Sequence, residues 1–347
     1  MGRLEDDFPV TTRRFTMSKA TVAIIAAASA ATGAGLSALW CHRGSDRIAT
    51  VQTAPQTTTP STFTRLPGPP VPPNQIPAPS LVRNAASPVD PTGLFEYGFP
   101  GPVVDDLTDM TLAGGYDRRT KNPYWIAEHI TADSLKEKHA DRKHSSFYED
   151  ERIPSAFRAK LQDYFRSGYD RGHQMPAADA KWSQEAMDKT FALSNMCPQV
   201  GDGFNRDYWA HFEDFCRRLT QKYPSVRIVT GPLYLPKRDS DGKWRVSYEM
   251  IGNPPNVAVP THFYKVIFAE DGKKGGKVSL GAFVLPNAKI PNDKSLQDFE
   301  VPLQAIERAS GLEFATKLDS SRQKKLCKEV KCEITVREFK KALPSSK

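Results

Sequence analysis

A proline-rich stretch divides this chain of 347 residues into parts with different folding potential. Residues 51–90 hold 10 of the 28 prolines, with Thr, Ser and Gln between them. Because proline lacks a backbone N–H and fixes φ, such a stretch cannot form the interior of a helix or a sheet. We therefore expect residues 51–93 to be a disordered linker, although a PxxP ligand for a partner fits the same composition. The folded domain is then expected at residues 94–340.

The part before the linker, residues 1–50, is predicted to be a targeting or membrane-anchor segment. Residues 20–40 run without a charge and are long enough to span a bilayer as a helix. The acidic side chains at positions 5–7 fit poorly with a mitochondrial transit peptide, which is normally poor in acids. Three interpretations stay open: a membrane anchor, a cleaved signal sequence, or part of a bipartite mitochondrial leader. Met17 is a second candidate start.

The charge of the expected domain is mildly basic. Residues 91–347 hold 40 Lys and Arg against 35 Asp and Glu. A basic surface attracts polyanions such as nucleic acid or anionic lipid, although a plain solvated surface explains so small an excess equally well. Five cysteines are too few for a disulfide framework, and no Cys/His set has zinc spacing. Cys327 and Cys332 are close enough to bridge, which the sequence leaves open.

The hydrophobic pattern predicts many strands and few helices. Strands are expected at 124–130, 226–230, 245–251, 257–259, 263–269 and 278–284, short helices at 156–165, 183–191 and 301–309, a surface loop at 131–152, and strand or loop at 193–199. Trp209, Phe212, Cys216 and Leu219 recur at helical spacing, so residues 205–222 should form one amphipathic helix. Without βαβ alternation, we expect a mixed α+β domain with a mainly antiparallel sheet core and flanking helices.

A short stretch around Arg171 and His173 carries the clearest chemical signal. Alternate side chains of a strand share a face, so these two should point the same way, with Gly172 leaving room for a substrate backbone. A neutral imidazole beside a guanidinium is suited to hydrolysis at phosphate, since the imidazole takes a proton from water and the guanidinium holds the anion. So short a pattern also arises by chance, in which case His173 only packs.

Asn205 and Glu213 form a second candidate pair, on the predicted long helix. Eight residues advance a helix by about 800°, which leaves the two about 80° apart in azimuth and roughly 12 Å apart in height. One direct oxygen ligand and one carboxylate reached through water would suit a hard cation such as Mg²⁺, which keeps several waters. The alternative is an Asn cap and a solvent-facing Glu.

Spaced motifs along the chain together resemble a known family. They are Asp170-Arg171-Gly172-His173, Asn195 in Leu193-Ser194-Asn195, Pro198-Gln199, Asn205-x-x-x-Trp209-x-x-x-Glu213 and Thr230-Gly231-Pro232-Leu233. This order resembles the DNA/RNA non-specific endonucleases, whose site is of the ββα-metal type. Further stretches are similar to the mitochondrial endonuclease G branch: 96–101, 259–263, 286–287 and 306–312. The resemblance covers roughly residues 94–316.

The resemblance implies a role for each matching residue. His173 would be the general base that activates water. Asn205 would be the one direct protein ligand to Mg²⁺, with Mn²⁺ as a substitute, and Glu213 would hold metal-bound waters. Arg171 and Arg142 would bind the phosphate or offset its developing charge.

The resemblance also implies supporting residues, partners and a location. Asp170 would be a substrate-binding residue and Asn195 a catalytic residue. Both would order the site. Lys143 is an alternative match for Arg142. The implied protein is a sugar-non-specific nuclease acting on DNA and RNA, a homodimer in the mitochondrial intermembrane space or held on the inner membrane by residues 20–40. A secreted nuclease with the same chemistry, and an inactive membrane-anchored nucleic-acid-binding protein, are the alternatives.

Overall fold

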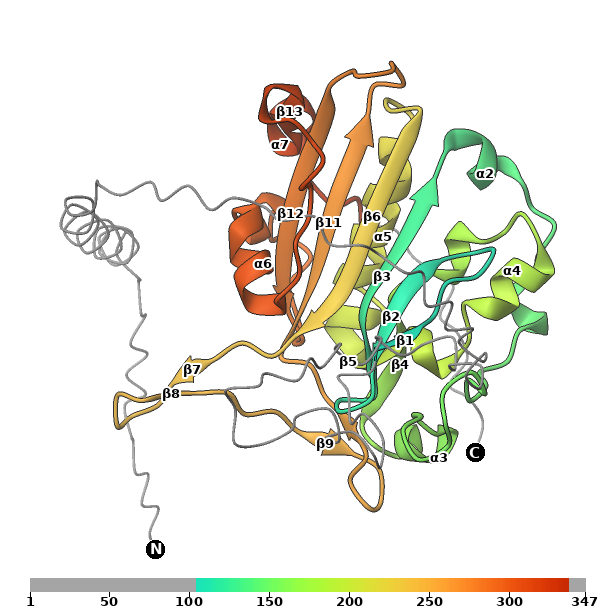
Figure 1. The fold of residues 1–347 in the computed structure, drawn as a ribbon, viewed down its shortest axis with the longest axis vertical. Coiled ribbons are helices and arrows are strands. Elements are labelled where there is room, and N and C mark those ends of the chain that lie inside the picture. Colours follow the sequence, from blue (N-terminus) through green and yellow to red (C-terminus); the bar gives the residue numbers. More distant parts are fainter. Residues whose placement is uncertain (1–103, 337–347) are drawn as a thin grey trace, which may run out of the picture. The chain divides into compact units, whose positions relative to one another are not determined.

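The computed structural model describes residues 104–336, and its core is a seven-stranded sheet (Figure 1). In spatial order the strands are β1 (Val104–Asp106), β2 (Ala113–Asp117), β3 (Asn122–Ile130), β6 (Ser225–Leu233), β11 (His262–Glu270), β12 (Val278–Pro286) and β13 (Gln323–Lys325). Neighbouring strands of this sheet pair antiparallel, apart from the parallel pair of β12 and β13. The architecture confirms the expected α+β class with a mainly antiparallel sheet.

Helices pack on both faces of the sheet. Val226 and Ile228 of β6 belong to the core cluster that includes helix α5 (Tyr208–Leu219), whereas Val229 packs in the cluster that includes helix α6 (Leu303–Ser310). Successive side chains of a strand point to opposite faces, so α5 and α6 cover opposite sides of the sheet. In Figure 1 helix α5 lies behind the strands.

A small hairpin stands beside the main sheet and completes the ββα motif. It consists of β4 (Tyr169–His173) and β5 (Met196–Val200), which pair antiparallel, and α5 follows β5 after one irregular turn. The expected room beside Gly172 is absent. A Cβ atom there would lie 2.1 Å from Oε1 of Gln199, whose side chain on β5 fills the space. Gly172 therefore serves the packing of the hairpin, and the prediction that a substrate backbone uses this gap is wrong.

The predicted helix at 205–222 is real but begins later and ends earlier, at Tyr208 and Leu219. The irregular turn before it, η5 (Gly201–Asn205), contains Gly203 at φ 78°, a left-handed conformation that interrupts helical geometry. Asp207 is also non-helical, with φ −136° and ψ −104°. Asn205 therefore lies in the turn, so the 80° and 12 Å separation expected from a shared helix is wrong.

The remaining elements are short. They are α2 (Ala132–Lys136), η2 (Arg142–His144), α3 (Leu161–Tyr164), η3 (Ala177–Asp179), α4 (Gln184–Lys189), η4 (Leu193–Asn195), β7 (Lys237–Arg238), β8 (Trp244–Arg245), β9 (Met250–Ile251), β10 (Val257–Ala258), η6 (Leu296–Phe299), η7 (Ser320–Arg322) and α7 (Leu326–Glu329).

Three of these elements correct the sequence predictions. The helix expected at 156–165 shrinks to α3, because Arg158 donates to the carbonyl of Ile153 and holds the preceding residues in a turn. The single strand expected at 245–251 is instead two short strands, β8 and β9. By contrast, Ser183 caps α4 as expected, accepting from the N–H of Ala186.

Cys327 and Cys332 form a disulfide, which answers the question that the sequence left open. Cys332 is buried in the core cluster that includes α5. Beside it, Arg218 of α5 donates through Nη2 to the carbonyl of Glu333 at 3.2 Å. The loop closed by the disulfide is therefore attached to the last turn of α5.

Replacing both cysteines of this disulfide with serine should lower the free energy of unfolding by roughly 2 kcal/mol, because the closed loop restricts the unfolded chain. For a domain of this size that corresponds to a melting temperature lower by about 4–8 °C. Thermal melting with and without a thiol reductant measures it. Reductant should shift the wild-type curve and leave the double variant unchanged. A wild-type curve insensitive to full reduction would contradict the expected stabilisation.

Several predictions concern residues that lie outside the described range: the targeting segment 1–50, the linker 51–93, and both ends of the expected domain, 94–103 and 337–340. Within residues 104–336 no helix is long and apolar enough to cross a membrane.

Candidate active site

Arg171 and His173 project from the same face of β4, as the alternation predicts. Both contact the ring of Phe147: the guanidinium carbon of Arg171 lies 4.3 Å from its centroid, and the ring centroid of His173 lies 5.7 Å away. Phe191 packs edge-on against the imidazole with its ring centroid at 4.9 Å. Two aromatic rings therefore hold the imidazole beside a cation.

His173 is held as an unprotonated base. It is buried, and its Nε2 atom has no hydrogen-bond partner among the described residues. Burial, and then the positive charge of Arg142, lower the pKa of His173 from 6.5 to about 3. At neutral pH its ring therefore has a nitrogen free to accept a proton, which is the state that a general base requires.

The free energy of unfolding should decrease as the pH falls, because the pKa of His173 is lower in the folded chain than in the unfolded chain. The unfolded chain binds a proton on His173 below about pH 6.5, whereas the folded chain binds it only near pH 3. The contribution is therefore fully present above pH 6.5 and is lost as the pH falls, with a limiting slope of about 1.4 kcal/mol per pH unit. Urea unfolding at a series of pH values should show a shallower acid decline for His173→Asn. Parallel curves for variant and wild type would contradict this.

Asn205 is fixed by its neighbours in one orientation. Its Nδ2 donates to Oδ2 of Asp170 at 2.8 Å, and the same carboxylate pairs with Nε of Arg206 at 3.0 Å. With the amide nitrogen bound to a carboxylate, the carbonyl oxygen Oδ1 is the atom of this side chain that can act as a ligand. A fixed neutral amide oxygen is a ligand type that hard divalent cations take, so the turn fits such an ion.

Glu213 lies in the second turn of α5 and is half-buried. Burial raises its pKa to about 7, against the opposing charges of Lys265, Arg217 and Arg142. Arg142 thus acts on both His173 and Glu213, which places the three groups around one site. Within residues 104–336 no group of three or more His, Cys, Asp and Glu side chains is placed to hold a metal ion.

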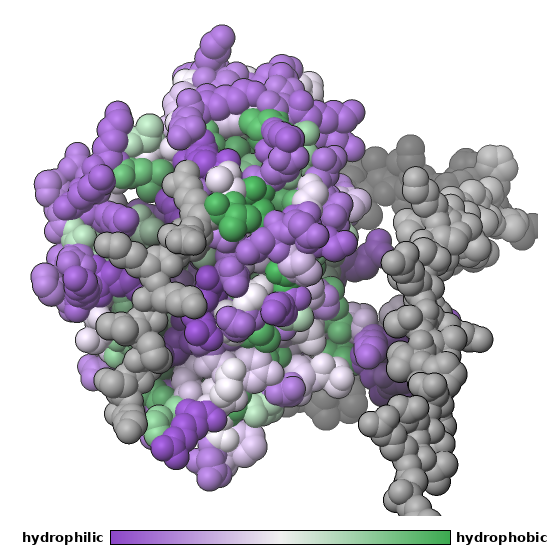
Figure 2. All heavy atoms as spheres, turned by 180° about the vertical axis from the view of Figure 1, so that it is seen from behind, coloured by the Kyte–Doolittle hydropathy of each residue, from purple (hydrophilic) through white to green (hydrophobic). Residues whose placement is uncertain are grey.

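Arg142, and not Lys143, packs against an aromatic ring of the site. Its guanidinium carbon lies 5.4 Å from the ring centroid of Phe191, and the side chain is otherwise exposed. Arg142 and Arg171 therefore lie one on each of the two rings that flank His173, and neither forms an ion pair within residues 104–336. Seen from behind, on the side of α5, the molecule is mainly hydrophilic (Figure 2).

Asn195 is placed differently from the other predicted residues. It is buried, and its amide is fully used: Oδ1 accepts from the N–H of Met175, and Nδ2 donates to the carbonyls of Met175 and Thr190. The side chain therefore fixes the backbone two residues beyond His173, and none of its hydrogen bonds within the described residues goes to another predicted site residue.

The sequence interpretation missed several members of this site. Phe147 and Phe191 form its aromatic wall, and nothing local in the sequence marks them. Arg217 had a usable signal, because it lies four residues after Glu213 and so on the same side of a helix. Its Nη1 lies 3.0 Å from Oδ1 of Asp179, a carboxylate that is almost fully buried.

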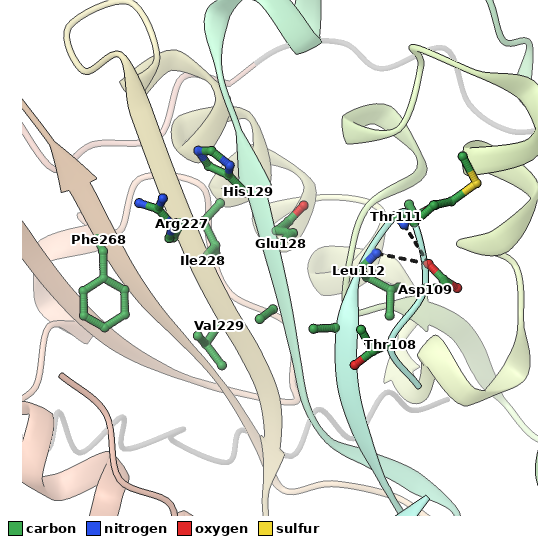
Figure 3. A pocket seen from close by; sticks show the side chains of 13 residues that line it. Thr108, Asp109, Thr111, Leu112, Glu128, His129, Arg227, Ile228, Val229 and Phe268 are labelled. Carbon is green, nitrogen blue, oxygen red and sulfur yellow. Dashed lines mark hydrogen bonds between the residues drawn. The ribbon is translucent and has the colours of Figure 1, made fainter. Parts of the chain in front are cut away.

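A cavity of about 380 Å³ lies elsewhere on the sheet (Figure 3). The loop at 108–113 forms one wall, and side chains of β3, β6 and β11, among them Val229 and Phe268, form the other. Val229 and Phe268 belong to the cluster on the α6 side, so the cavity opens on the opposite face from α5. None of Arg142, Arg171, His173, Asn205 and Glu213 lines it.

Comparison with known proteins agrees with the geometry. The profile of the DNA/RNA non-specific endonucleases matches residues 90–321. The "Mitochondrial nuclease" of Saccharomyces cerevisiae is 60% identical over 277 residues, covering 79% of this chain and 84% of that protein. "Endonuclease G, mitochondrial" of Caenorhabditis elegans is 44% identical over 242 residues, 69% of this chain and 77% of that protein.

A solved structure supports the same assignment. It is the crystal structure of an EndoG/EndoGI complex, which matches with a TM-score of 0.62 and 43% identity and covers 70% of this chain and 100% of that chain. A ββα motif that carries His173 and Asn205, the profile match and these relatives lead to one conclusion. This chain belongs to the DNA/RNA non-specific endonucleases, in the mitochondrial endonuclease G branch, and is a phosphodiester hydrolase.

Proposed function

We propose that this nuclease cleaves both DNA and RNA with weak sequence preference, using Mg²⁺, with Mn²⁺ as a substitute. The observation that carries the proposal is the hydrogen bond from Nδ2 of Asn205 to Asp170, which leaves the amide oxygen as the ligand atom beside β4, the strand that carries both Asp170 and His173. Contacts to phosphate carry no sequence information, so a site built around phosphate and cation acts on the backbone.

Each residue has a defined part in this proposal. His173 accepts a proton from the attacking water. Arg171 and Arg142 bind the phosphate and offset the charge that develops on it. Asn205 holds the cation directly and Glu213 holds it through water. When bound, the ion supplies charge stabilisation at the phosphate oxygens.

Cleavage of supercoiled plasmid and of a structured RNA by the purified full chain tests the proposal. Both substrates should be cut with Mg²⁺, and EDTA should stop both reactions. Binding of nucleic acid without any cleavage would instead support the alternative of an inactive binding protein. Cleavage confined to one short DNA sequence would contradict weak sequence preference.

Phosphate contact by Arg142 should appear in the salt dependence of DNA binding. Each neutralised phosphate contributes roughly −0.9 to the slope of log K against log salt, because counterions are released. Arg142→Ala should therefore weaken binding and reduce the slope by about one. Arg308→Ala is the matched control, since Arg308 is also exposed but lies on α6, across the sheet. Equal slopes for Arg142→Ala and wild type would remove Arg142 from the substrate contact.

The proposed location is the mitochondrial intermembrane space or inner membrane, with residues 20–40 as the anchor. Support comes from the uncharged run at 20–40 and from relatives that are named mitochondrial. Residues 1–90 fused to a fluorescent protein test it, and secretion of the fusion would favour the secreted nuclease.

We also propose that two copies associate through an extended arm, residues 236–250, which includes β7 and β8 and projects from the sheet in Figure 1. Trp244, Val246 and Tyr248 are exposed at alternate positions of this arm. Apolar side chains gathered in the open commonly mark association surfaces. Sedimentation should give the mass of a dimer, and Trp244→Ser with Val246→Ser should give the mass of a monomer.

A further inference from the structure

Ionisable side chains are buried beneath α5, behind Glu213. Glu128 of β3, Asp179 of η3 and Lys265 of β11 are 5%, 3% and 1% exposed. Arg217 of α5 completes the set through its ion pair with Asp179. Removing charged groups from water costs several kcal/mol for each ion unless hydrogen bonds and opposite charges compensate. The partners of each group therefore decide which form it takes.

Three of the four groups have a clear partner. Asp179 accepts from Nη1 of Arg217 at 3.0 Å. Lys265 donates through Nζ to Oγ1 of Thr230 at 2.8 Å, and its ammonium lies 4.9 Å from the ring centroid of Trp209. Arg217 and Lys265 are thus each held by another partner, and neither donates a hydrogen bond to Glu128.

Glu128 is the exception. Both of its carboxyl oxygens are buried, and neither has a hydrogen-bond donor among the described residues. The group within hydrogen-bonding reach is the carboxyl of Asp179, which is itself an acceptor. Two buried carboxyls can bond to each other only when one of them carries a proton.

The charges around Glu128 indicate which of the two is protonated. Burial and the negative charge of Asp179 raise the pKa of Glu128 well above its usual range, and Glu213 adds to this while Lys265 opposes it. Asp179 already accepts a hydrogen bond from the guanidinium of Arg217 at 3.0 Å. Glu128 is therefore the donor between the two carboxyls, and Asp179 is the acceptor.

We propose that Glu128 is a positioning residue of the active site, which donates a hydrogen bond as a neutral acid to Asp179 and so holds that carboxylate on Arg217. The inference rests on the proposed nuclease mechanism. The chain from Glu128 through Asp179 to Arg217 connects three elements: β3, the segment that follows His173, and α5. Arg217 lies one helical turn after Glu213, and its charge acts on that carboxylate. The ion pair of Asp179 and Arg217 therefore holds the segment that follows His173 and the helix that carries Glu213 in one relative position.

Two substitutions of Glu128 separate the hydrogen bond from the volume of the side chain. Glu128→Gln keeps the shape and offers an amide N–H to Asp179, whereas Glu128→Leu has nearly the same volume and offers no donor. In the full-length protein, Glu128→Leu should lose roughly 10- to 100-fold in kcat, the usual cost of removing an outer partner of a metal site. Its KM for plasmid should be unchanged, and Glu128→Gln should keep a kcat close to that of wild type.

Infrared difference spectroscopy of wild type against Glu128→Gln supplies a readout that needs no activity. Because Glu213, with a pKa of about 7, contributes equally to both proteins, its band cancels in the difference. The difference spectrum at neutral pH should therefore contain the carbonyl stretch of one protonated, buried carboxyl group that the variant lacks. This result stands even if Glu128→Leu does not fold, and it is independent of whether the chain cleaves nucleic acid. Absence of that band, equal loss of activity in both variants, or full activity of a folded Glu128→Leu would overturn the proposal.

Discussion

Replacing His173 with alanine should reduce the rate of phosphodiester hydrolysis by roughly 10²- to 10⁴-fold, the usual contribution of a general base. The imidazole is buried between Phe147 and Phe191, and its low pKa keeps it neutral and able to accept a proton. Alanine removes that acceptor but leaves Asn205 and its bond to Asp170 intact. Single-turnover nicking of plasmid measures the rate, and a separate titration should find DNA and Mg²⁺ affinities close to those of wild type.

The space left by the imidazole gives this prediction a second test. Added imidazole should restore part of the rate of His173→Ala, because a free base can enter between the two rings. His129→Ala is the matched control: His129 is exposed on β3 and, among the described residues, hydrogen-bonds to Ser225 away from the site, so its loss should not change the rate. Near-normal activity of His173→Ala would show that another group is the base.

Replacing Asn205 with alanine should weaken the binding of the cation and leave the proton transfer unchanged. The change removes the fixed amide oxygen, so the affinity for Mg²⁺ should fall by more than the 10- to 100-fold typical of outer partners. The rate defect should therefore shrink as Mg²⁺ is raised, and imidazole should have no effect. Asp170→Ala should give a milder defect of the same kind, because Asp170 only orients the amide of Asn205. Rate measurements across a Mg²⁺ series separate these outcomes.

Asp202→Ala is the control for this pair, since Asp202 is exposed in the same turn and, within residues 104–336, makes no hydrogen bond or ion pair with Asn205 or Asp170. It should leave the Mg²⁺ dependence unchanged. A Mg²⁺ dependence of Asn205→Ala that is identical to wild type would remove Asn205 from the metal site. Rescue of that variant by imidazole would point to disruption of the base instead.

The side of a strand or helix on which a residue lies follows from short periodicities. Arg171 and His173 are two positions apart and do share a face of β4, where both contact Phe147. Trp209 and Phe212 follow the helical period and are buried beneath the sheet. The predicted strands at 124–130, 226–230, 263–269 and 278–284 and the α+β class follow from the same local rules. These features depend on backbone geometry over a few residues, which is why the amino-acid sequence alone was sufficient to predict them.

Other features of the site were decided by the tertiary structure alone, because they depend on contacts between segments that are distant in the sequence. Asn205 lies outside α5 because the turn passes through a left-handed Gly203, which packs beneath the side chain of Lys289. The space beside Gly172 is closed by Gln199 of the neighbouring strand. Glu128 of β3 and Asp179 of η3 are distant in the sequence and meet only in the folded chain. Such pairings arise from long-range packing, so no local pattern specifies which side chain fills a gap or which carboxyl keeps its proton.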